Sequence, residues 1–179
     1  MNKRKIIAIV VGVLTIGILA FLFYGISTKS SRKRAIAQEL STIPTFEFHQ
    51  LCGNTYTQDS LNKQQSAVFI YFHSDCDFCV HKARNIAEHL HNFVDTQLLF
   101  VSSESVEMIQ LFAENKGLLN QPNVLFLQDR KHIFPMRFDV NSSPHALVYD
   151  KNGQLLRRFA GQVLATTIIN VLQESEMSK

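Results

Sequence analysis

The sequence has only three cysteines among its 179 residues, and no second pair of metal ligands at the spacing of a zinc site. Cys76 and Cys79 form a close pair, whereas Cys52 stands alone. A structural zinc site takes four ligands, usually from two pairs of Cys or His residues at short spacing. His89 and His91 are two positions apart, so on a helix they point to different sides. The sequence therefore predicts no bound metal.

Acidic residues are missing from positions 1–34, which hold seven of the 18 Lys and Arg residues. The other eleven face 15 Asp and Glu residues, so residues 35–179 carry a formal charge of about −4. The positive net charge of the chain thus belongs to its N-terminal part. Because nucleic-acid binding needs a basic patch on the folded domain, this distribution predicts no nucleic-acid partner.

Charged residues and proline are both absent from Ile6–Tyr24, an apolar run of 19 residues. At about 1.5 Å per residue, a helix of this length covers roughly the hydrocarbon thickness of a bilayer. The apolar region of a signal peptide is usually about 7–15 residues long and ends at a small-residue site. This run is longer and ends in Phe21-Leu22-Phe23-Tyr24. We therefore expect an uncleaved membrane anchor that contacts the membrane through residues 6–24.

The sequence divides into three segments. We expect a membrane anchor over residues 1–28, a juxtamembrane linker over residues 29–41 and one folded domain over residues 42–175. Basic residues stand on both sides of the apolar run, so the positive-inside rule alone does not fix the orientation of the anchor.

Strand-like and helix-like stretches alternate through the expected domain. Apolar or alternating runs and an Asn-Gly turn predict strands at Thr45–Gln50, Ala67–Phe72, Leu98–Val101, Val124–Leu127, Ala146–Tyr149 and Gln154–Phe159. Helical periodicity predicts helices at Cys79–Phe93, Val106–Lys116, His132–Phe138 and Val163–Leu172. This order predicts an α/β three-layer sandwich with a mixed central sheet, preceded by one N-terminal transmembrane helix.

Cys76 and Cys79 stand just after the expected strand Ala67–Phe72 and open the next helix. Ser74 or Asp75 can cap that helix. The N–H groups of its first turn and the helix dipole favour a thiolate at Cys76. Cys79 lies one turn further, on the apolar side, so we expect it to be more buried than Cys76.

This asymmetry suits a two-step exchange of disulfides. The exposed thiolate of Cys76 attacks a substrate disulfide, and the thiol of Cys79 then attacks the mixed disulfide and releases the reduced substrate. Two idle core thiols are the alternative, but idle thiols do not usually stand where a strand passes into a helix. We therefore predict a redox-active Cys76–Cys79 disulfide and no other cofactor.

The order of these features resembles the thioredoxin fold. The resemblance rests on a buried strand followed by Cys76-Asp77-Phe78-Cys79, on Ser143-Pro144 ahead of a later strand, and on the Asn152-Gly153 turn. With the apolar N-terminal run and the lead-in Pro44-Thr45-Phe46, the chain is similar to membrane-anchored, TlpA-like thiol–disulfide oxidoreductases. The resemblance covers residues 42–175 and implies a thioredoxin-like three-layer sandwich.

The resemblance also implies roles for four residues. Cys76 matches the attacking cysteine of the family and Cys79 the resolving cysteine. Pro144 matches the cis-proline of the family, which packs against the dithiol. Ser143 would then offer its backbone N–H and C=O groups to an extended segment of the substrate.

The chain departs from the family pattern at three places. Asp75 stands where the family usually has a tryptophan, and Phe78 stands where it often has a proline. Ile70 stands where thioredoxins place a buried acid, so no proton shuttle for Cys79 is evident from the sequence.

Four residues near the motif are candidate modulators. His73, Asp75 and Asp77 are candidates to replace the missing acid. Because carboxylates oppose a negative charge on the sulfur of Cys76, the two aspartates favour a reducing couple. His145 follows Pro144 and could stabilise a thiolate or bind copper. We expect the isolated Cys52 to be a spectator thiol.

We therefore expect a membrane-tethered enzyme that reduces protein disulfides. Its partners would be protein thiols and disulfides. Since the sequence has no nucleotide-binding signature, electrons would come from an upstream thiol protein, such as a membrane protein. Turnover with protein disulfides belongs in a compartment where disulfides persist. This favours a single-pass protein of the bacterial inner membrane, with its catalytic domain facing the periplasm or the cell exterior.

Two alternative functions stay open. A copper-binding, thioredoxin-like metallochaperone would use Cys76, Cys79 and His145. A peroxiredoxin-like peroxidase is less favoured, because that family has a Pro and a Thr or Ser ahead of its reactive cysteine, a pattern that His73-Ser74-Asp75 does not reproduce.

Overall fold

The computed structural model describes residues 12, 17, 21 and 40–177, and the chain divides into two units, residues 1–39 and 40–179. Within the first unit, Gly12, Gly17 and Phe21 are helical. None of the helices among the described residues has both the length and the apolar character needed to cross a bilayer. Apart from those three residues, the predicted anchor over residues 6–24 lies outside the described part of the chain.

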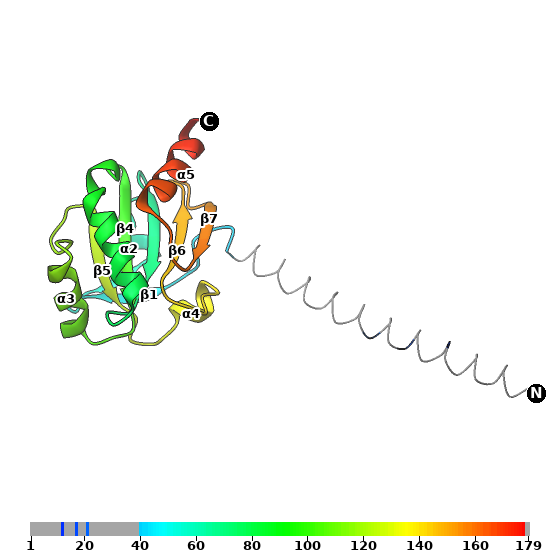
Figure 1. Ribbon diagram of the computed structural model, residues 1–179, viewed down its shortest axis with the longest axis horizontal. Coiled ribbons are helices and arrows are strands. Elements are labelled where there is room, and N and C mark those ends of the chain that lie inside the picture. The colour runs from blue at the N-terminus through cyan, green and yellow to red at the C-terminus, as the bar shows by residue number, and fades with distance from the viewer. Residues whose placement is uncertain (1–11, 13–16, 18–20, 22–39, 178–179) are drawn as a thin grey trace, which may run out of the picture. The chain divides into compact units, whose positions relative to one another are not determined.

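Seven strands in the described part of the second unit form one sheet, in the order β2-β1-β5-β4-β3-β6-β7 (Figure 1). The strands are β1 (Glu47–Gln50), β2 (Thr55–Thr57), β3 (Ser66–Tyr71), β4 (Thr96–Ser102), β5 (Val124–Gln128), β6 (His145–Tyr149) and β7 (Leu155–Ala160). β4 runs parallel to β3 and β5, whereas β1 and β6 run antiparallel to both of their neighbours. The prediction of a mixed sheet is confirmed.

Helices cover both faces of the sheet. They are α2 (Asp77–Glu88), α3 (Val106–Asn115), α4 (Phe134–Arg137) and α5 (Ala165–Met177), with short 3-10 helices at η1 (Gln58–Ser60) and η2 (Leu90–Asn92). Buried side chains of α2, α3 and α5 share one core with the sheet, and those of α4 share the core on the other face. Figure 1 shows α2 crossing in front of the strands. The predicted three-layer sandwich is thus confirmed.

β3 lies inside the sheet and is covered by a hydrophobic core on both faces, which explains its continuous apolar sequence. All six of its residues are buried. Val68 and Ile70 pack in the core beneath α2, whereas Phe69 and Tyr71 pack in the core that contains α4. Successive side chains of a strand point to opposite faces, so a strand covered on both sides needs apolar residues at every position.

The observed elements differ from the predicted ones most in α2, β2 and the last helix. α2 ends at Glu88, although apolar residues recur as far as Phe93, because Leu90 and Phe93 still pack against the core beyond the helix. β2 was not predicted, because a strand of three residues is too short to show a pattern. The last helix begins at Ala165 and continues to Met177.

The sheet brings three loops to one edge. β3 and β4 are parallel, so the loops that follow them leave from the same edge. β6 is antiparallel to β3, and its first residue, His145, pairs with Tyr71 at the end of β3. The loop after β3 carries Cys76, and the loop before β6 carries Ser143 and Pro144. Residues far apart in the sequence therefore meet at this edge.

Candidate active site

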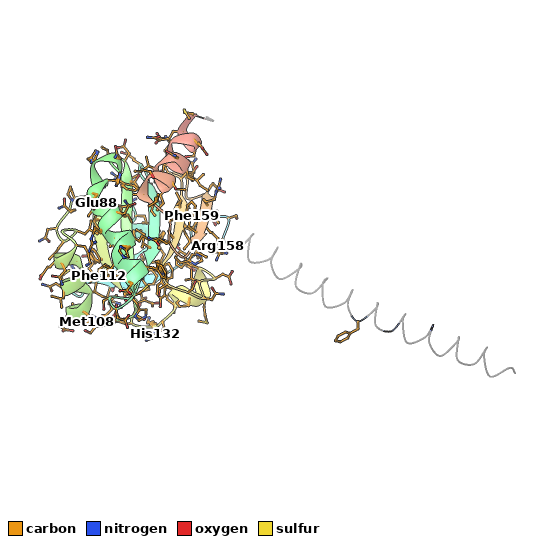
Figure 2. The ribbon with its side chains drawn as sticks, in the orientation of Figure 1. Glu88, Met108, Phe112, His132, Arg158 and Phe159 are labelled. Carbon is orange, nitrogen blue, oxygen red and sulfur yellow. The ribbon has the colours of Figure 1, made fainter. Side chains whose placement is uncertain are left out.

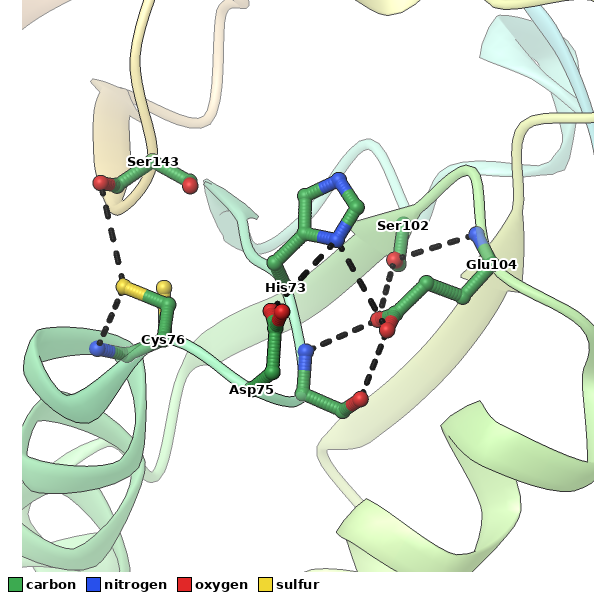
Figure 3. Close-up of polar contacts among 8 residues, drawn as sticks. His73, Asp75, Cys76, Ser102, Glu104 and Ser143 are labelled. Atoms are coloured by element: carbon green, nitrogen blue, oxygen red, sulfur yellow. Dashed lines mark hydrogen bonds and ion pairs between the residues drawn. The ribbon is translucent and has the colours of Figure 1, made fainter.

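Cys76 is the N-cap residue of α2. Its Sγ accepts a hydrogen bond from the backbone N–H of Cys79 at 3.3 Å (Figure 3). The prediction that Ser74 or Asp75 caps this helix is wrong, because the side chain of Ser74 bonds to Glu104 instead. The sulfur of Cys76 consequently lies at the positive end of the helix dipole.

The two cysteines differ in exposure, as predicted. Cys76 is partly buried, Cys79 is only 2% exposed, and both thiols are free. Burial, followed by the hydrogen bond with Cys76, raises the pKa of Cys79 to about 12. Cys79 is therefore a neutral thiol in the reduced protein, and its proton must be removed before it can act as a nucleophile.

Ser143 and Pro144 lie beside the pair. The peptide bond between them is cis, as the resemblance implied. The thiol of Cys76 donates to the carbonyl oxygen of Ser143 across 3.9 Å (Figure 3). The carbonyl of Pro144 accepts from the backbone N–H of Gly161 at 2.8 Å, which fixes this loop to the end of β7.

Glu104 holds the loop before Cys76, and nothing in the sequence pointed to it. Its carboxylate accepts hydrogen bonds from the backbone N–H of Ser74 at 2.8 Å, the Ser74 hydroxyl at 2.6 Å and the Ser102 hydroxyl at 2.9 Å (Figure 3). Burial alone would raise the pKa of Glu104, but the bonds from Ser74 and Ser102 outweigh it and hold that pKa below its usual range. The contact joins loops 30 residues apart, which no local pattern could show.

The other modulators predicted beside the motif lie around Cys76. Asp75 and Asp77 are exposed, and His73 is half-buried. The Nδ1 atom of His73 lies 3.6 Å from Glu104 and 3.9 Å from Asp75 (Figure 3). No hydrogen bond or ion pair joins the side chain of any of these three predicted modulators to Cys79.

The same residues form a cluster with metal-ligand atoms. His73, Asp75 and Glu104 each offer one such atom, and these atoms lie within 4.8 Å of one another. Both carboxylate oxygens of Glu104 already accept hydrogen bonds from serines. Among the described residues, this is the only group of three or more His, Cys, Asp or Glu side chains whose ligand atoms lie close enough to hold a metal ion. Cys76, Cys79 and His145 therefore do not form a second such group.

His145 is buried at the start of β6, with 4% exposure. Neither ring nitrogen has a hydrogen-bond partner among the residues that the structure describes. Burial first, and then the positive charges of Arg158 and Lys82, lower the pKa of His145 to about 4. The imidazole is therefore neutral near pH 7.

Lys82 is a second residue that the sequence did not reveal, because it falls among polar residues of the α2 pattern. It is only 1% exposed, and its Nζ donates to the carbonyl oxygen of Gly161 at 2.9 Å. Burial lowers the pKa of Lys82 to about 8, while attraction to Cys79 and then Cys76 acts in the opposite direction. Lys82 therefore lies within electrostatic reach of both sulfur atoms of the pair.

Apolar side chains surround the exposed side of the site. Phe78 is 59% exposed between the two cysteines, and Met108 and Leu111 are exposed on α3. Figure 2 labels Met108 and Phe112 on this helix. A groove of about 210 Å³ separates α3 from the loop before Cys76, and it is lined by Ser74, Asp75, Val80, Met108, Leu111, Phe112, Asn115 and Lys116.

Cys52 lies outside the site, as its sequence position suggested. It is exposed in the turn between β1 and β2. Its thiol donates to the side-chain oxygen of Gln50 at 3.4 Å.

Comparison with known proteins gives a family and a fold. A family model described as the AhpC/TSA family matches residues 41–160. A search of curated proteins finds no match.

Solved structures with a similar fold include both disulfide oxidoreductases and a peroxidoxin. A secreted Mycobacterium tuberculosis disulfide oxidoreductase, described as homologous to Escherichia coli DsbE, has a TM-score of 0.62 and 17% identity, covering 76% of this chain and 98% of that one. Peroxidoxin BcpB from Mycobacterium tuberculosis has a TM-score of 0.64 and 16% identity, covering 74% and 94%. StoA from Bacillus subtilis has a TM-score of 0.57 and 14% identity, covering 73% and 98%. At these identities, the similarity establishes a thioredoxin-like fold.

Proposed function

The chain belongs to the AhpC/TSA family, and on that premise we propose that it is a thiol–disulfide oxidoreductase that reduces protein disulfides through Cys76 and Cys79. One observation carries the proposal: a partly exposed thiol caps α2, and a buried thiol lies one turn behind it. This is the arrangement that two-step exchange needs, with one sulfur open to a substrate and the other kept for the second step.

In the proposed reaction, Cys76 attacks first. Its thiolate displaces one sulfur of a substrate disulfide and forms a mixed disulfide with the other. Cys79 then loses its proton and attacks the sulfur of Cys76, which releases the second substrate thiol and leaves a Cys76–Cys79 disulfide. The helix dipole stabilises the Cys76 thiolate as the attacking group.

A protein substrate fits the surface beside the pair. The backbone of Ser143 lies next to the sulfur of Cys76 and can bond to an extended segment, as strand-adding peptides do. The exposed side chains of Phe78, Met108 and Leu111 add apolar contact area.

The charges near Cys76 support reduction of the substrate as the direction that we propose. Asp75 and Asp77 are exposed on either side of it, and their carboxylates oppose a thiolate. A couple with a less stabilised thiolate is a weaker oxidant, which favours reduction of substrates. We propose that an upstream thiol protein, such as a membrane protein, returns electrons to the pair.

We further propose that residues 6–24 tether the domain to the bacterial inner membrane, with the catalytic domain in the periplasm or outside the cell, as in the TlpA-like proteins that the sequence resembles. The length and uncharged character of Ile6–Tyr24 support this. A reporter fused to the C-terminus tests the orientation: activity of a reporter that works only outside the cytoplasm is expected, and activity of a cytoplasmic reporter would contradict it.

A peroxidase is the second candidate, because the chain belongs to the AhpC/TSA family and a peroxidoxin shares its fold. In that reaction a peroxide would oxidise Cys76 to a sulfenic acid, and Cys79 would condense with it to the same disulfide. Consumption of hydrogen peroxide that outpaces the reduction of a protein disulfide would favour this candidate. The copper-binding alternative has less support, because Cys76, Cys79 and His145 do not gather as a ligand set in the described residues.

Trapping of the mixed disulfide tests the proposal. In a Cys79→Ser variant of the full chain, the second step is blocked, so Cys76 should accumulate covalent adducts with substrate proteins that a reductant releases. Cys52→Ser is the matched control and should trap nothing. If Cys79→Ser gives no adducts, or gives them equally when Cys76 is also replaced, exchange through Cys76 is excluded.

A further inference from the structure

Lys82 is a charged side chain buried in the core. It is 1% exposed, and its Nζ donates a hydrogen bond of 2.9 Å to the carbonyl oxygen of Gly161, in the loop between β7 and α5. No carboxylate lies within ion-pair distance of it in the described chain. A lysine is seldom fully buried unless it is paired, because removing the ammonium from water is costly. The charge of Lys82 therefore has no carboxylate to balance it among the described residues.

The sulfur atoms of the pair are the nearby groups that become anionic during disulfide exchange. Cys79 and Lys82 are three residues apart on α2, so they share one side of the helix. The charge of Lys82 attracts Cys79 most strongly and Cys76 next. From β6, the neighbouring titratable group is His145, which burial keeps neutral. From α5, the buried side chains are apolar: Ala165, Ile168, Ile169 and Leu172.

We propose that Lys82 is the buried counter-ion that stabilises the thiolate of Cys79 while Cys79 resolves a mixed disulfide. The inference rests on the proposed function. Ile70 cannot take a proton from Cys79. No hydrogen bond or ion pair joins the side chains of His73, Asp75 or Asp77 to Cys79, so Lys82 is the charged group to which we assign the ionisation of Cys79.

Cys79 gives its proton to water, and its thiolate attacks the Sγ atom of Cys76. The bond between Cys76 and the substrate sulfur breaks, and the substrate leaves as a thiolate that takes up a proton from water. The two cysteines are oxidised to a disulfide, and the substrate disulfide is reduced to two thiols.

The hydrogen bond of Lys82 to Gly161 also has a structural role, because Gly161 contacts the loop that contains Pro144. Gly161 accepts from Lys82 and donates its own N–H to the carbonyl of Pro144 at 2.8 Å. Loss of this link could shift the Ser143–Pro144 loop without any effect of charge. A test must therefore separate the charge of Lys82 from its position.

Stopped-flow kinetics with a chromogenic aryl disulfide make this separation, on the reduced full chain with Cys52→Ser as the background, because the exposed thiol of Cys52 would also release aryl thiolate. The first release of aryl thiolate reports the attack by Cys76, and the second reports resolution by Cys79. Lys82→Gln removes the charge but keeps a donor for Gly161, and Lys82→Met removes both. Arg84→Gln is the matched control, since Arg84 is exposed on the same helix. Lys82→Met is expected to stay folded, because an apolar residue of similar volume often replaces a buried charge without loss of stability.

Both Lys82 variants should slow the second release about tenfold or more near pH 7 and shift its pH profile upward, since each pKa unit is a factor of ten in thiolate. The first release should change much less, and Arg84→Gln should match the Cys52→Ser background. An unchanged second release, or an equal slowing of both releases without a shifted pH profile, overturns the role of Lys82. Absence of two-phase release in the Cys52→Ser background would instead count against the proposed function.

Discussion

The two thiols of the site have different surroundings, and this difference begins with single residues. Cys76 is partly exposed and caps α2, where backbone N–H groups point at its sulfur. Cys79 is 2% exposed, and burial raises its pKa to about 12. An exposed nucleophile and a buried partner that must be deprotonated give the exchange a fixed order.

His145 gives a prediction at the same scale. Its pKa is about 4 in the folded protein, below the value of roughly 6.5 in an unfolded chain, so the unfolded state binds the proton more tightly. The corresponding stability is complete above about pH 6.5 and is lost as the pH falls to about 4, by about 3 kcal/mol in all. Urea unfolding of the reduced full chain at a series of pH values should show this fall.

Two variants isolate the contribution of His145. His145→Gln should flatten the acid-side loss of unfolding free energy relative to the wild type. His81→Gln, at an exposed position of α2, should leave the loss unchanged. If His145→Gln and the wild type lose stability in parallel, then His145 is not held neutral in the folded protein.

The residues of the site that belong to a local motif were predictable from the sequence. Cys76 and Cys79 were recognisable from their spacing after an apolar strand, and Pro144 from the resemblance. Glu104 and Lys82 were not recognisable. Glu104 acts across 30 residues of chain, and Lys82 falls at a helical position where lysine is ordinarily solvated.

At the scale of elements, the site depends on loops that parallel strands bring together. β3 pairs with β4 over the whole length of β3, from Ser66 with Thr96 to Tyr71 with Val101. The loop after β4 therefore presents Glu104 to Ser74 in the loop after β3. This contact holds the segment that enters α2 and so positions the sulfur of Cys76.

Glu104→Gln should weaken this connection. The variant loses the charge on an acceptor of three hydrogen bonds, and charge-assisted bonds of this kind contribute about 1.5–3 kcal/mol each, so a loss of roughly 2 kcal/mol is expected. Chemical denaturation measures the loss. Glu174→Gln, an exposed change on α5, is the control and should have little effect. Equal stability of the two variants would show that the carboxylate does not hold the loop.

Element bounds were predictable only where the apolar pattern and the backbone change together. The apolar run Ala67–Phe72 is bounded by Ser66 and His73, and β3 was predicted within one residue of its position. The apolar pattern of α2 continues through Leu90 and Phe93, whose side chains stay in the core after the helix ends. Contacts with the core therefore continue beyond the last residue of the helix. For this reason, the apolar periodicity alone overestimates the length of the helix.

At the scale of the whole molecule, the folded unit is contained in the second part of the chain. Both hydrophobic cores are built from residues between 43 and 172. The AhpC/TSA match covers residues 41–160 and falls inside this unit. Among the described residues, the second unit therefore holds both cores and the candidate site.

A fragment of residues 40–179 should therefore fold by itself. Its urea unfolding should be cooperative, and its rate of exchange with an aryl disulfide should be within about twofold of that of the full chain, since a domain with its own core folds as a unit. The full chain held in detergent is the control. A fragment that lacks a cooperative transition would mean that residues 1–39 contribute to the core.

Reversible formation of a Cys76–Cys79 disulfide is the feature on which the proposed function depends most directly. The full chain can be equilibrated in glutathione buffers of graded ratio, quenched with acid, alkylated and mapped by mass spectrometry. We predict one two-electron transition, in which Cys76 and Cys79 lose their alkylation together while Cys52 stays alkylated throughout. Alkylation of both Cys76 and Cys79 at every ratio, or a disulfide that joins either of them to Cys52, would contradict it.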